Sequence, residues 1–546
     1  MTSGIDKITE AYHEKLERLE TWSGFQVKDI YTPRDMDGID YDKDIADAGQ
    51  YPFTRGIHPN MFRGRLWTRR GITGYGSPTD TNKRLKFQIE EGATGLWLIP
   101  DLPTHLYIDG DHPRAEGEVG RVGIPLYSLI DMEDAMNEID IDKITMTFGG
   151  QSPVALCEYF AYAEKQGVPL QKVRGTLQND PIHGYVAYGF LREFPLDLAI
   201  KLCIDVTEYC AKKAPLWNSM CIGFYNWREM GINAAQELAF GLSSVSFYIE
   251  EALKRGLNID EFAPKISAYP SVHIDFFEEL AKIRALRRMW AKMLKDKFGA
   301  KDARSLKFRF GVRTSGCSLV RQQPLNNIIR IAYEALAGVL AGCQSLELCC
   351  YDEPIALPTE EAIRICFRTQ QIIAYETGAA NVSDPLGGSY YIENLTNKLE
   401  EEANKIINEI EEMGGALKAA KTGWFDREVE RAALKNQKQI NAGERTIVGV
   451  NAFTIPPEED TPIKVYRIPT EGEKEVVDKL KTLKETRDGG KVKETLVRLH
   501  REAERGDKVN LIPPILDAVK AYATTGEIMG TIRQAYGYSY DPFEGR

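Results

Sequence analysis

Residues 55–82 read RGIHPNMFRGRLWTRRGITGYGSPTDTN and contain five arginines, with no acidic residue before Asp80. The chain as a whole has a formal net charge of -11, so this basic stretch stands apart from it. A cluster of guanidinium groups can hold an anion, and the competing interpretation is an arginine-rich loop that faces solvent. Because an acidic chain is unsuited to general nucleic-acid or membrane-surface binding, we expect a local site at most.

A second set of residues is small or polar and lies inside short apolar runs that are typical of strands. Burying so many polar groups without partners would cost about 1–3 kcal/mol each. They therefore bond to one another and to water, or they line the path of a long polar ligand, which is the interpretation we favour. The set comprises Thr145, Thr147, Thr176, Gln178, Ser219, Ser267, Thr314, Ser315, Gln344 and Ser345.

Eight apolar runs, each followed by a helical pattern, must position these residues. The clearest helices are expected at residues 153–167, 195–213 and 326–342. Eight βα units in series predict an α/β fold, a (β/α)8 TIM-type barrel. The fifth run is ambiguous because FYIEEALKRG also has helical spacing. The runs are 93–102, 143–150, 173–180, 219–226, 243–250, 265–272, 306–316 and 343–353.

The remaining sequence predicts four parts. Residues 1–54 read as an N-terminal helix (5–20) and an extended segment, and residues 55–450 as the barrel, with charged helices over 386–448. A linker rich in proline and acidic residues is expected at 451–462, and a helical C-terminal extension at 463–546. The apolar spacing of this extension would suit a face that docks on the barrel or on a partner.

Composition narrows the class of protein. The chain is 43% hydrophobic and 27% charged, which is typical of globular enzymes. Its nine cysteines form no CxxC pair, which favours buried thiols in a reducing compartment over disulfides or zinc. No apolar run is long enough for a membrane helix, and MTSGIDKITEAYHEK does not read as a signal peptide. We therefore expect a cytoplasmic enzyme or enzyme subunit that binds neither nucleic acid nor membrane.

Longer motifs add a more specific indication. They are RLWTRR (65–70) with Gly74, TLQND (176–180), TSGCSL (314–319), CQSLELCCYDE (343–353), DPLGGSYYIENLT (384–396), INEIEEMGG (407–415) and IVGVNAF (447–453). Together they resemble the large, substrate-binding subunit of the adenosylcobalamin-dependent acyl-CoA mutases, the methylmalonyl-CoA mutase family. The resemblance covers roughly residues 50–455.

The resemblance implies a (β/α)8 barrel whose axis takes the pantetheine arm of coenzyme A, which would explain the small polar strand residues. The basic segment would wrap the coenzyme A tail, whose phosphates suit arginine side chains. Lys265 stands where the family often has arginine, so a cation is kept. The coenzyme A contacts implied are His58, Asn60, Met61, Arg65, Thr68, Arg70, Thr145, Thr147, Thr176, Lys265, Ser267 and Gln344.

The chemistry implied by the resemblance is a radical rearrangement with adenosylcobalamin, in which the thioester carbonyl group migrates to the neighbouring carbon. The protein's part is to position the substrate and exclude water. Glu353 matches the glutamate that contacts the adenosyl ribose. Tyr225 matches a tyrosine near the reacting centre, the alternative being a core aromatic residue, and Gln178 joins it in the implied catalytic group. Asn226 stands where the family has a histidine that hydrogen-bonds the thioester carbonyl.

One expected motif is missing. The family's cobalamin domain ligates cobalt through the histidine of an Asp-x-His-x-x-Gly motif, and none of the seven histidines has that context. We therefore expect a separate cobalamin-binding small subunit and no metal ligand in this chain. By resemblance, two large and two small subunits would form a heterotetramer.

The expected substrate pocket departs from known members. Ile72 replaces the tyrosine of methylmalonyl-CoA mutases, and Tyr188 replaces the arginine that grips the substrate carboxylate. Cys317 replaces a tryptophan, and Trp97 replaces a small residue. The 2-hydroxyisobutyryl-CoA mutases share isoleucine at position 72 but have an aspartate at the position of Ile99. Isobutyryl-CoA mutases have phenylalanine and glutamine at positions 72 and 188.

These departures predict a different acyl group. We favour a bulky aryl- or alkylsuccinyl-CoA that is converted to a branched malonyl-CoA, because Tyr188 can flank a ring or a longer chain. Arg69 and Arg313 are cations outside the family pattern, and either could pair a substrate carboxylate. The alternative is a phosphate contact for Arg69 and a strand-end salt bridge for Arg313.

Three other functions stay open. The chain could be a non-catalytic paralogue that scaffolds a mutase heterodimer, or a 2-hydroxyisobutyryl- or isobutyryl-CoA mutase subunit. It could also be a barrel enzyme, such as a hydrolase, that uses coenzyme A esters without cobalamin. The last lacks a convincing nucleophile–histidine–acid set, since only His105 and His183 lie near expected strand ends. A scaffold has no need of a coenzyme A tunnel, so retained Gln178, Gln344 and Glu353 favour an enzyme.

Overall fold

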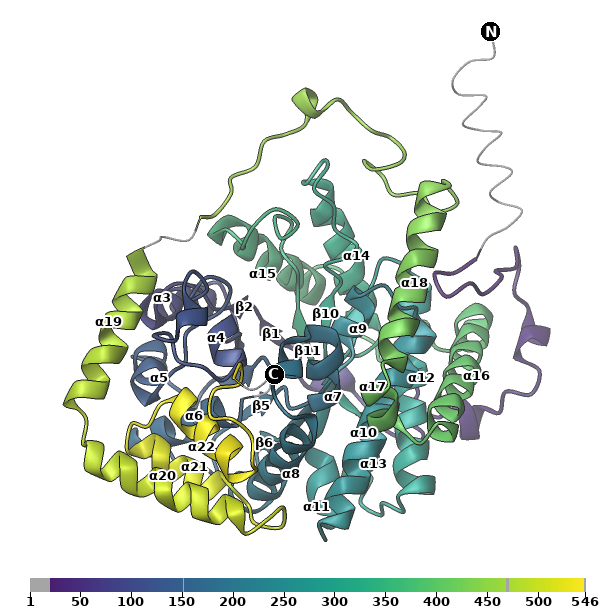
Figure 1. Cartoon of the computed structure of the whole chain (residues 1–546). Helices are drawn as coiled ribbons and strands as arrows, with labels where there is room; N and C mark the ends of the chain where they lie inside the picture. The colour runs from purple at the N-terminus through teal and green to yellow at the C-terminus, as the bar shows by residue number, and fades with distance from the viewer. Residues whose placement is uncertain (1–19, 151, 468–470, 545–546) are drawn as a thin grey trace.

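The computed structural model describes residues 20–150, 152–467 and 471–544, and its centre is a ring of parallel strands surrounded by helices (Figure 1). The expected helix at residues 5–20 falls, except for Glu20, outside the described residues. The strands are β1 (Thr68–Arg70), β2 (Ile72–Thr73), β3 (Gly95–Leu98), β4 (Thr145–Phe148), β5 (Gly175–Leu177), β6 (Trp217–Asn218), β7 (Met220–Gly223), β8 (Ile266–Tyr269), β9 (Ser271–Val272), β10 (Arg309–Thr314) and β11 (Ser345–Glu347).

The strand pairings close on themselves. One sheet runs β2-β3-β4-β5-β6 and the other β1-β11-β10-β8-β7, with β9 beside β10. Only Gly71 separates β1 from β2, and only Ser219 separates β6 from β7, so the two sheets share two broken strands. Pro270 breaks a third strand between β8 and β9, since proline cannot donate a ladder hydrogen bond. The result is an eight-stranded parallel barrel, as the sequence predicted.

Two strand predictions need correction. Residues 243–250 are not a strand, because they lie within helix α10 (Ala234–Lys254). Asn233 and Gln236 form a capping box that starts this helix, and no residue breaks it before Gly256. The strand that opens the barrel is instead β1–β2, inside the basic segment. This strand was not predicted because its sequence is polar and is interrupted by Gly71. Run 93–102 therefore supplies the second strand of the barrel and not the first.

Helices follow the strands and cover the ring. The predicted helices at 153–167, 195–213 and 326–342 are confirmed as α6, α8 and α14. The covering helices are α3 (Pro78–Glu90), α5 (Leu129–Ala135), α6 (Pro153–Lys165), α8 (Leu196–Lys213), α10, α12 (Phe276–Lys292), α14 (Asn326–Leu340) and α15 (Glu360–Tyr375). Shorter helices are α2 (Met61–Gly64), α4 (Leu102–His105), α7 (Pro181–His183), α9 (Tyr225–Glu229), α11 (Ile259–Phe262) and α13 (Ala303–Leu306).

Further helices pack outside this ring. The expected charged helices are α16 (Tyr390–Glu412), α17 (Ala416–Lys421) and α18 (Trp424–Asn441), with α16 against α10 and α12. Residues 442–467 contain no named strand or α-helix and arch over one edge of the molecule (Figure 1). They lead to α19 (Glu471–Thr486), α20 (Gly489–Glu504), α21 (Ile512–Lys520) and α22 (Thr525–Ala535).

The C-terminal helices are part of the barrel's hydrophobic core. Ile512, Ile515 and Val519 of α21 are buried and pack against α6. Helix α6 is therefore covered on both sides, which explains its apolar sequence all round. In the described ranges, no helix combines the length and hydrophobicity that crossing a membrane requires.

Candidate active site

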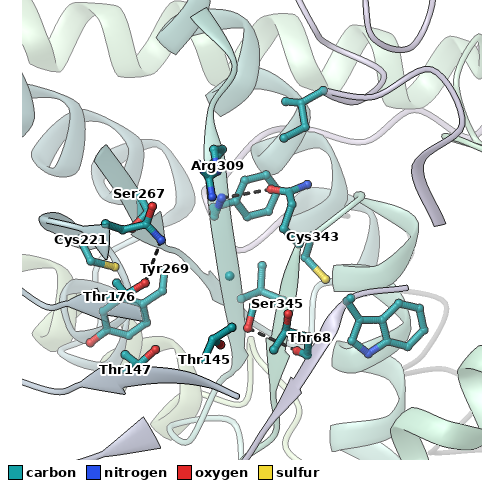
Figure 2. Close-up of a pocket in the computed structure, with 18 of the residues that line it drawn as sticks. Thr68, Thr145, Thr147, Thr176, Cys221, Ser267, Tyr269, Arg309, Cys343 and Ser345 are labelled. Atoms are coloured by element: carbon teal, nitrogen blue, oxygen red, sulfur yellow. Dashed lines mark hydrogen bonds between the residues drawn. The ribbon is translucent and has the colours of Figure 1, made fainter. Parts of the chain in front are cut away.

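A cavity of about 560 Å³ lies inside the ring of strands. Successive strand side chains point to opposite faces, so Thr145 and Thr147 of β4 both point inward. Thr176 of β5 and Ser267 of β8 approach the same space from other strands (Figure 2). All the residues expected to contact coenzyme A line this cavity, except Asn60, which precedes helix α2 and is exposed.

Several polar groups of the lining are also bonded within the barrel. Asn218 donates to Thr176 at 3.0 Å, and Ser267 donates to the carbonyl of Met220 at 3.4 Å. The Gln344 amide accepts from the Phe310 N–H at 3.1 Å and donates to the Gly342 carbonyl at 2.8 Å. The interpretation that these residues bond within the protein is thus met in part, and the polar ligand path stays a prediction. Six of the ten residues line the cavity, namely Thr145, Thr147, Thr176, Ser267, Gln344 and Ser345.

Cations gather where this cavity meets the amino ends of the strands. His58, Arg65 and Lys265, which were expected to contact coenzyme A, lie there. The structure adds Arg174, Arg304, Lys307 and Arg309. The sequence does carry a signal for these cations, because a basic residue recurs shortly before several strands. These residues are Arg65, Arg174, Lys265 and Lys307, and Arg309 begins a strand.

The cations at this mouth lie close enough to repel one another. Burial, and then the charges of Arg309, Arg304 and Arg174, lower the pKa of Lys265. Burial, and then Lys307 and Arg309, lower the pKa of His58. Such a cluster of like charges favours a ligand that carries several negative charges, as phosphates do.

Two arginines of the basic segment lie elsewhere. Arg70 lies inside the barrel and donates to the carbonyl of Leu96 at 2.7 Å and to Ser345 Oγ at 3.0 Å. Burial lowers its pKa to about 10, and its donors brace the strands from the cavity wall. Arg69 precedes Arg70 in β1, so its side chain points to the outer face of the barrel, where it donates to the carbonyl of Gly92 at 2.9 Å. Its side chain is thus directed away from the cavity.

The inner end of the cavity is bounded by Trp97 and Tyr269, whose rings meet edge to face at 5.2 Å. Gly149 leaves room for this pair and for Ile99, because a Cβ added there would lie 2.1 Å from Ile99 Cδ1. Ile72 pairs with Trp97 in the register of β2 and β3. The expected pocket residues Ile72, Trp97 and Ile99 therefore do lie together.

Beyond Tyr269, at the carboxyl ends of the strands, the proposed catalytic residues meet. The Tyr269 hydroxyl donates to Asn226 Oδ1 at 2.8 Å and lies 3.3 Å from the Tyr188 hydroxyl. The Gln178 side chain hydrogen-bonds both tyrosines. Tyr225 stacks on Tyr269 with ring centroids 5.9 Å apart. Nothing in the sequence indicated Tyr269, although its hydroxyl contacts Asn226 and Tyr188 and its ring stacks on Tyr225.

Arg313 is balanced by two carboxylates. Its Nη2 donates to Glu353 Oε1 at 3.0 Å, and its Nε lies 2.7 Å from Glu347 Oε2. The guanidinium carbon also lies 4.8 Å from the centre of the Tyr225 ring. The expected alternative of a strand-end salt bridge describes this geometry.

Cys317 lies on the loop after β10, next to Gly316, whose backbone N–H donates to the Tyr225 hydroxyl at 3.3 Å. Its backbone N–H donates to Glu229 Oε2 at 2.7 Å, and its thiol lies 3.2 Å from Ser315 Oγ. Although the residue is exposed at the surface, desolvation of the thiol by the surrounding loop, followed by the charge of Glu229, raises its pKa to about 12. The thiol is therefore protonated at neutral pH and is not set up as a nucleophile.

Comparisons with known proteins agree with the motifs. The profile of the family described as Methylmalonyl-CoA mutase matches residues 20–538. The chain is 38% identical to the 2-hydroxyisobutanoyl-CoA mutase large subunit of Aquincola tertiaricarbonis, over 96% of this chain and 93% of that protein. It is 37% identical to a methylmalonyl-CoA mutase of Rhizobium meliloti, over 98% and 76%. It is 38% identical to the human mitochondrial methylmalonyl-CoA mutase, over 95% and 68%.

Proposed function

The chain belongs to the methylmalonyl-CoA mutase family of cobalamin-dependent isomerases, and from this premise we propose that it is the large subunit of a two-component acyl-CoA mutase. Its substrate is a bulky acyl-CoA other than methylmalonyl-CoA. The observation that carries the proposal is the axial cavity of about 560 Å³ with cations at one end and Tyr188, Tyr225 and Asn226 beyond the other.

The cavity suits coenzyme A in two ways. The phosphates of the tail carry several negative charges, which match the cations Arg65, Arg174, Lys265, Lys307 and Arg309. The pantetheine arm is long, narrow and rich in amides, which match the small hydroxyl side chains along the strands. The acyl group would then reach Trp97 and Tyr269 at the inner end.

The carboxyl ends of the strands suit the reaction. Adenosylcobalamin, when bound, supplies the radical that rearranges the carbon skeleton, and the chain's residues hold the substrate and exclude water. Glu353 fits the adenosyl group because its carboxylate can accept from ribose hydroxyls while Arg313 holds Oε1. The lower ligand of cobalt is proposed to come from a small subunit. The relative named a large subunit, which this chain matches over nearly its full length, supports that arrangement.

The acyl pocket narrows the substrate. Tyr188 offers a hydroxyl where a charged arginine would grip a carboxylate, and the charge of Arg313 is already balanced by Glu347 and Glu353. A succinyl-type carboxylate would have to draw Arg313 away from these partners. We therefore propose that the acyl group is bulky and carries an aryl or alkyl substituent. If it is an aryl- or alkylsuccinyl group, its free carboxylate requires Arg313 to change partners.

The test combines the full chain, a cognate cobalamin-binding small subunit and adenosylcobalamin. Methylmalonyl-, isobutyryl-, 2-hydroxyisobutyryl-, alkylsuccinyl- and arylsuccinyl-CoA are supplied in turn, and isomers are separated by chromatography and identified by mass spectrometry. The proposal expects isomerisation of a bulky ester and little of methylmalonyl-CoA. Dominant turnover of 2-hydroxyisobutyryl-CoA would overturn the substrate class. Binding of the small subunit without any turnover would favour the scaffold.

A further inference from the structure

Gln178, Tyr188, Tyr269 and Asn226 lie in a chain of polar contacts, and the orientation of the Gln178 amide is defined at one end. The backbone N–H of Gly150 donates to Gln178 Oε1 at 3.0 Å. A backbone N–H can only donate, so this contact fixes the oxygen of the Gln178 amide on that side. The amide nitrogen is then the group that meets the hydroxyls of Tyr188 and Tyr269.

At the other end of these contacts, Tyr269 meets Asn226. The Tyr269 hydroxyl has a single proton, which it donates to Asn226 Oδ1 at 2.8 Å. The Tyr188 hydroxyl lies 3.3 Å from the same Tyr269 hydroxyl. With Oδ1 occupied, Asn226 has its Nδ2 amino group left to offer. No described residue accepts a hydrogen bond from that nitrogen in the contacts of Asn226.

Resting on the function proposed above, we propose that Tyr269 is a positioning residue that holds the Asn226 amide so that it presents N–H donors to the thioester carbonyl of the acyl-CoA. A side-chain amide has two orientations that differ by the exchange of its oxygen and nitrogen. In the reversed orientation the Asn226 oxygen would face the substrate carbonyl and repel it. Donation from the Tyr269 hydroxyl to Oδ1 favours the orientation in which Oδ1 faces Tyr269 and Nδ2 is left for the substrate.

Tyr269 is well placed for this role. It ends strand β8 and is buried, with the ring of Trp97 against one side and that of Tyr225 stacked on it. Burial raises the pKa of Tyr269 and of Tyr188, so both keep their protons at neutral pH. The series of hydrogen bonds ends at the neutral amide of Asn226. Donation from this amide to the thioester is therefore insensitive to pH, unlike donation from a histidine.

The test replaces the hydroxyl and keeps the ring, with Tyr269→Phe. Tyr351→Phe is the matched control, since Tyr351 is buried after β11 and outside this chain of hydrogen bonds. Acetyl-CoA labelled with ¹³C at the thioester carbonyl is bound to the full chain, and its carbonyl stretch is recorded by difference infrared spectroscopy. Hydrogen bonds to the carbonyl lower this frequency, so we expect a shift in wild type and Tyr351→Phe and none in Tyr269→Phe or Asn226→Ala.

The outcomes separate this inference from the proposed function. A shift that persists in Tyr269→Phe, or that is absent in wild type, overturns the positioning role alone. Failure of acetyl-CoA to bind overturns the proposed function as well. With the small subunit and an active ester, Tyr269→Phe should lower kcat about fivefold to tenfold, as expected for one hydrogen bond, with little change in KM. In an Asn226→Ala background it should have no further effect, and additive losses would contradict action through Asn226.

Discussion

Arg313 and Glu353 are joined by a 3.0 Å hydrogen bond between opposite charges at the carboxyl end of the barrel. Glu347 approaches the same guanidinium at 2.7 Å, and the Tyr225 ring lies beneath it at 4.8 Å. A cation that could have paired a substrate carboxylate is therefore engaged by the protein. Its position links the carboxylate proposed for the adenosyl ribose with the tyrosine proposed for the reacting centre.

Arg313→Met should destabilise the fold, because it leaves two carboxylates close together without their cation. We expect the free energy of unfolding to fall by about 3–5 kcal/mol, as when one partner of a buried ion pair is removed. Arg313→Lys keeps the charge and should lose much less. Urea denaturation followed by circular dichroism measures both. A fully stable Arg313→Met would show that the ion pairs contribute little, and would reopen Arg313 as a substrate contact.

Lys265→Met should weaken binding of coenzyme A about tenfold, because a charge-assisted hydrogen bond to phosphate contributes about 1.5 kcal/mol. Arg309→Met should act similarly, and both losses should shrink at high salt. Titration calorimetry with coenzyme A, and with pantetheine, which has no phosphate, measures the effect. Lys438→Met on α18 is the control. An equal loss of pantetheine affinity would place Lys265 against another part of the ligand.

Sequence patterns predicted the barrel because a strand followed by a helix is a local signal repeated along the chain. The inward pair Thr145 and Thr147 could be read in the same way from the alternation of a strand. The predicted number of eight strands was nevertheless correct only because two errors cancelled: one helical stretch was counted as a strand, and one strand was missed. The stretch 243–250 has a helical alternative that only its cap at Asn233 resolves, and β1–β2 is too polar to stand out.

The missed site residues depend on contacts between distant units. Arg174 and Arg309 become neighbours of Lys265 only when the ring closes, since nothing in the local sequence joins them. Tyr269 reads as an ordinary apolar strand residue. Its role follows from Asn226, which is 43 positions earlier in the chain. Likewise, the partners of Arg313 could not be chosen from sequence among 80 acidic residues.

Trp97→Ala should shift acyl preference towards larger groups. Trp97 closes the inner end of the cavity against Tyr269, and its removal opens space there. We expect the ratio of affinities for phenylacetyl-CoA over acetyl-CoA to rise about tenfold, with stability lowered by about 3–5 kcal/mol. Calorimetric titration with each ester measures the ratio.

Gly149→Ala is the opposite change at the same place, because its Cβ would press on Ile99 Cδ1. It should lower the affinity for phenylacetyl-CoA more than that for acetyl-CoA. If both variants left the ratio unchanged, the acyl group would have to lie outside the space between Trp97 and Ile99.

Glu158→Gln should stabilise the protein increasingly as pH rises. Glu158 on α6 is fully buried, and no described residue hydrogen-bonds either carboxylate oxygen. Burial, followed by the charges of Asp131 and Asp109, raises its pKa well above the usual value. Folding therefore takes up a proton at any pH between the unfolded and folded pKa values. Stability is lost with rising pH in that window, at up to about 1.4 kcal/mol per pH unit.

Glutamine carries no titrating proton, so the variant lacks the part of the pH dependence of the unfolding free energy that Glu158 contributes. Asp131 and Asp109 titrate in both proteins, and their contributions largely cancel in the difference. Urea denaturation at several pH values from 5 to 8 tests the expectation, with the exposed Glu90→Gln of α3 as control. A difference that stays constant over this range would mean that Glu158 is ionised in the folded protein. In that case a cation or bound water must compensate its charge inside α6's apolar surroundings.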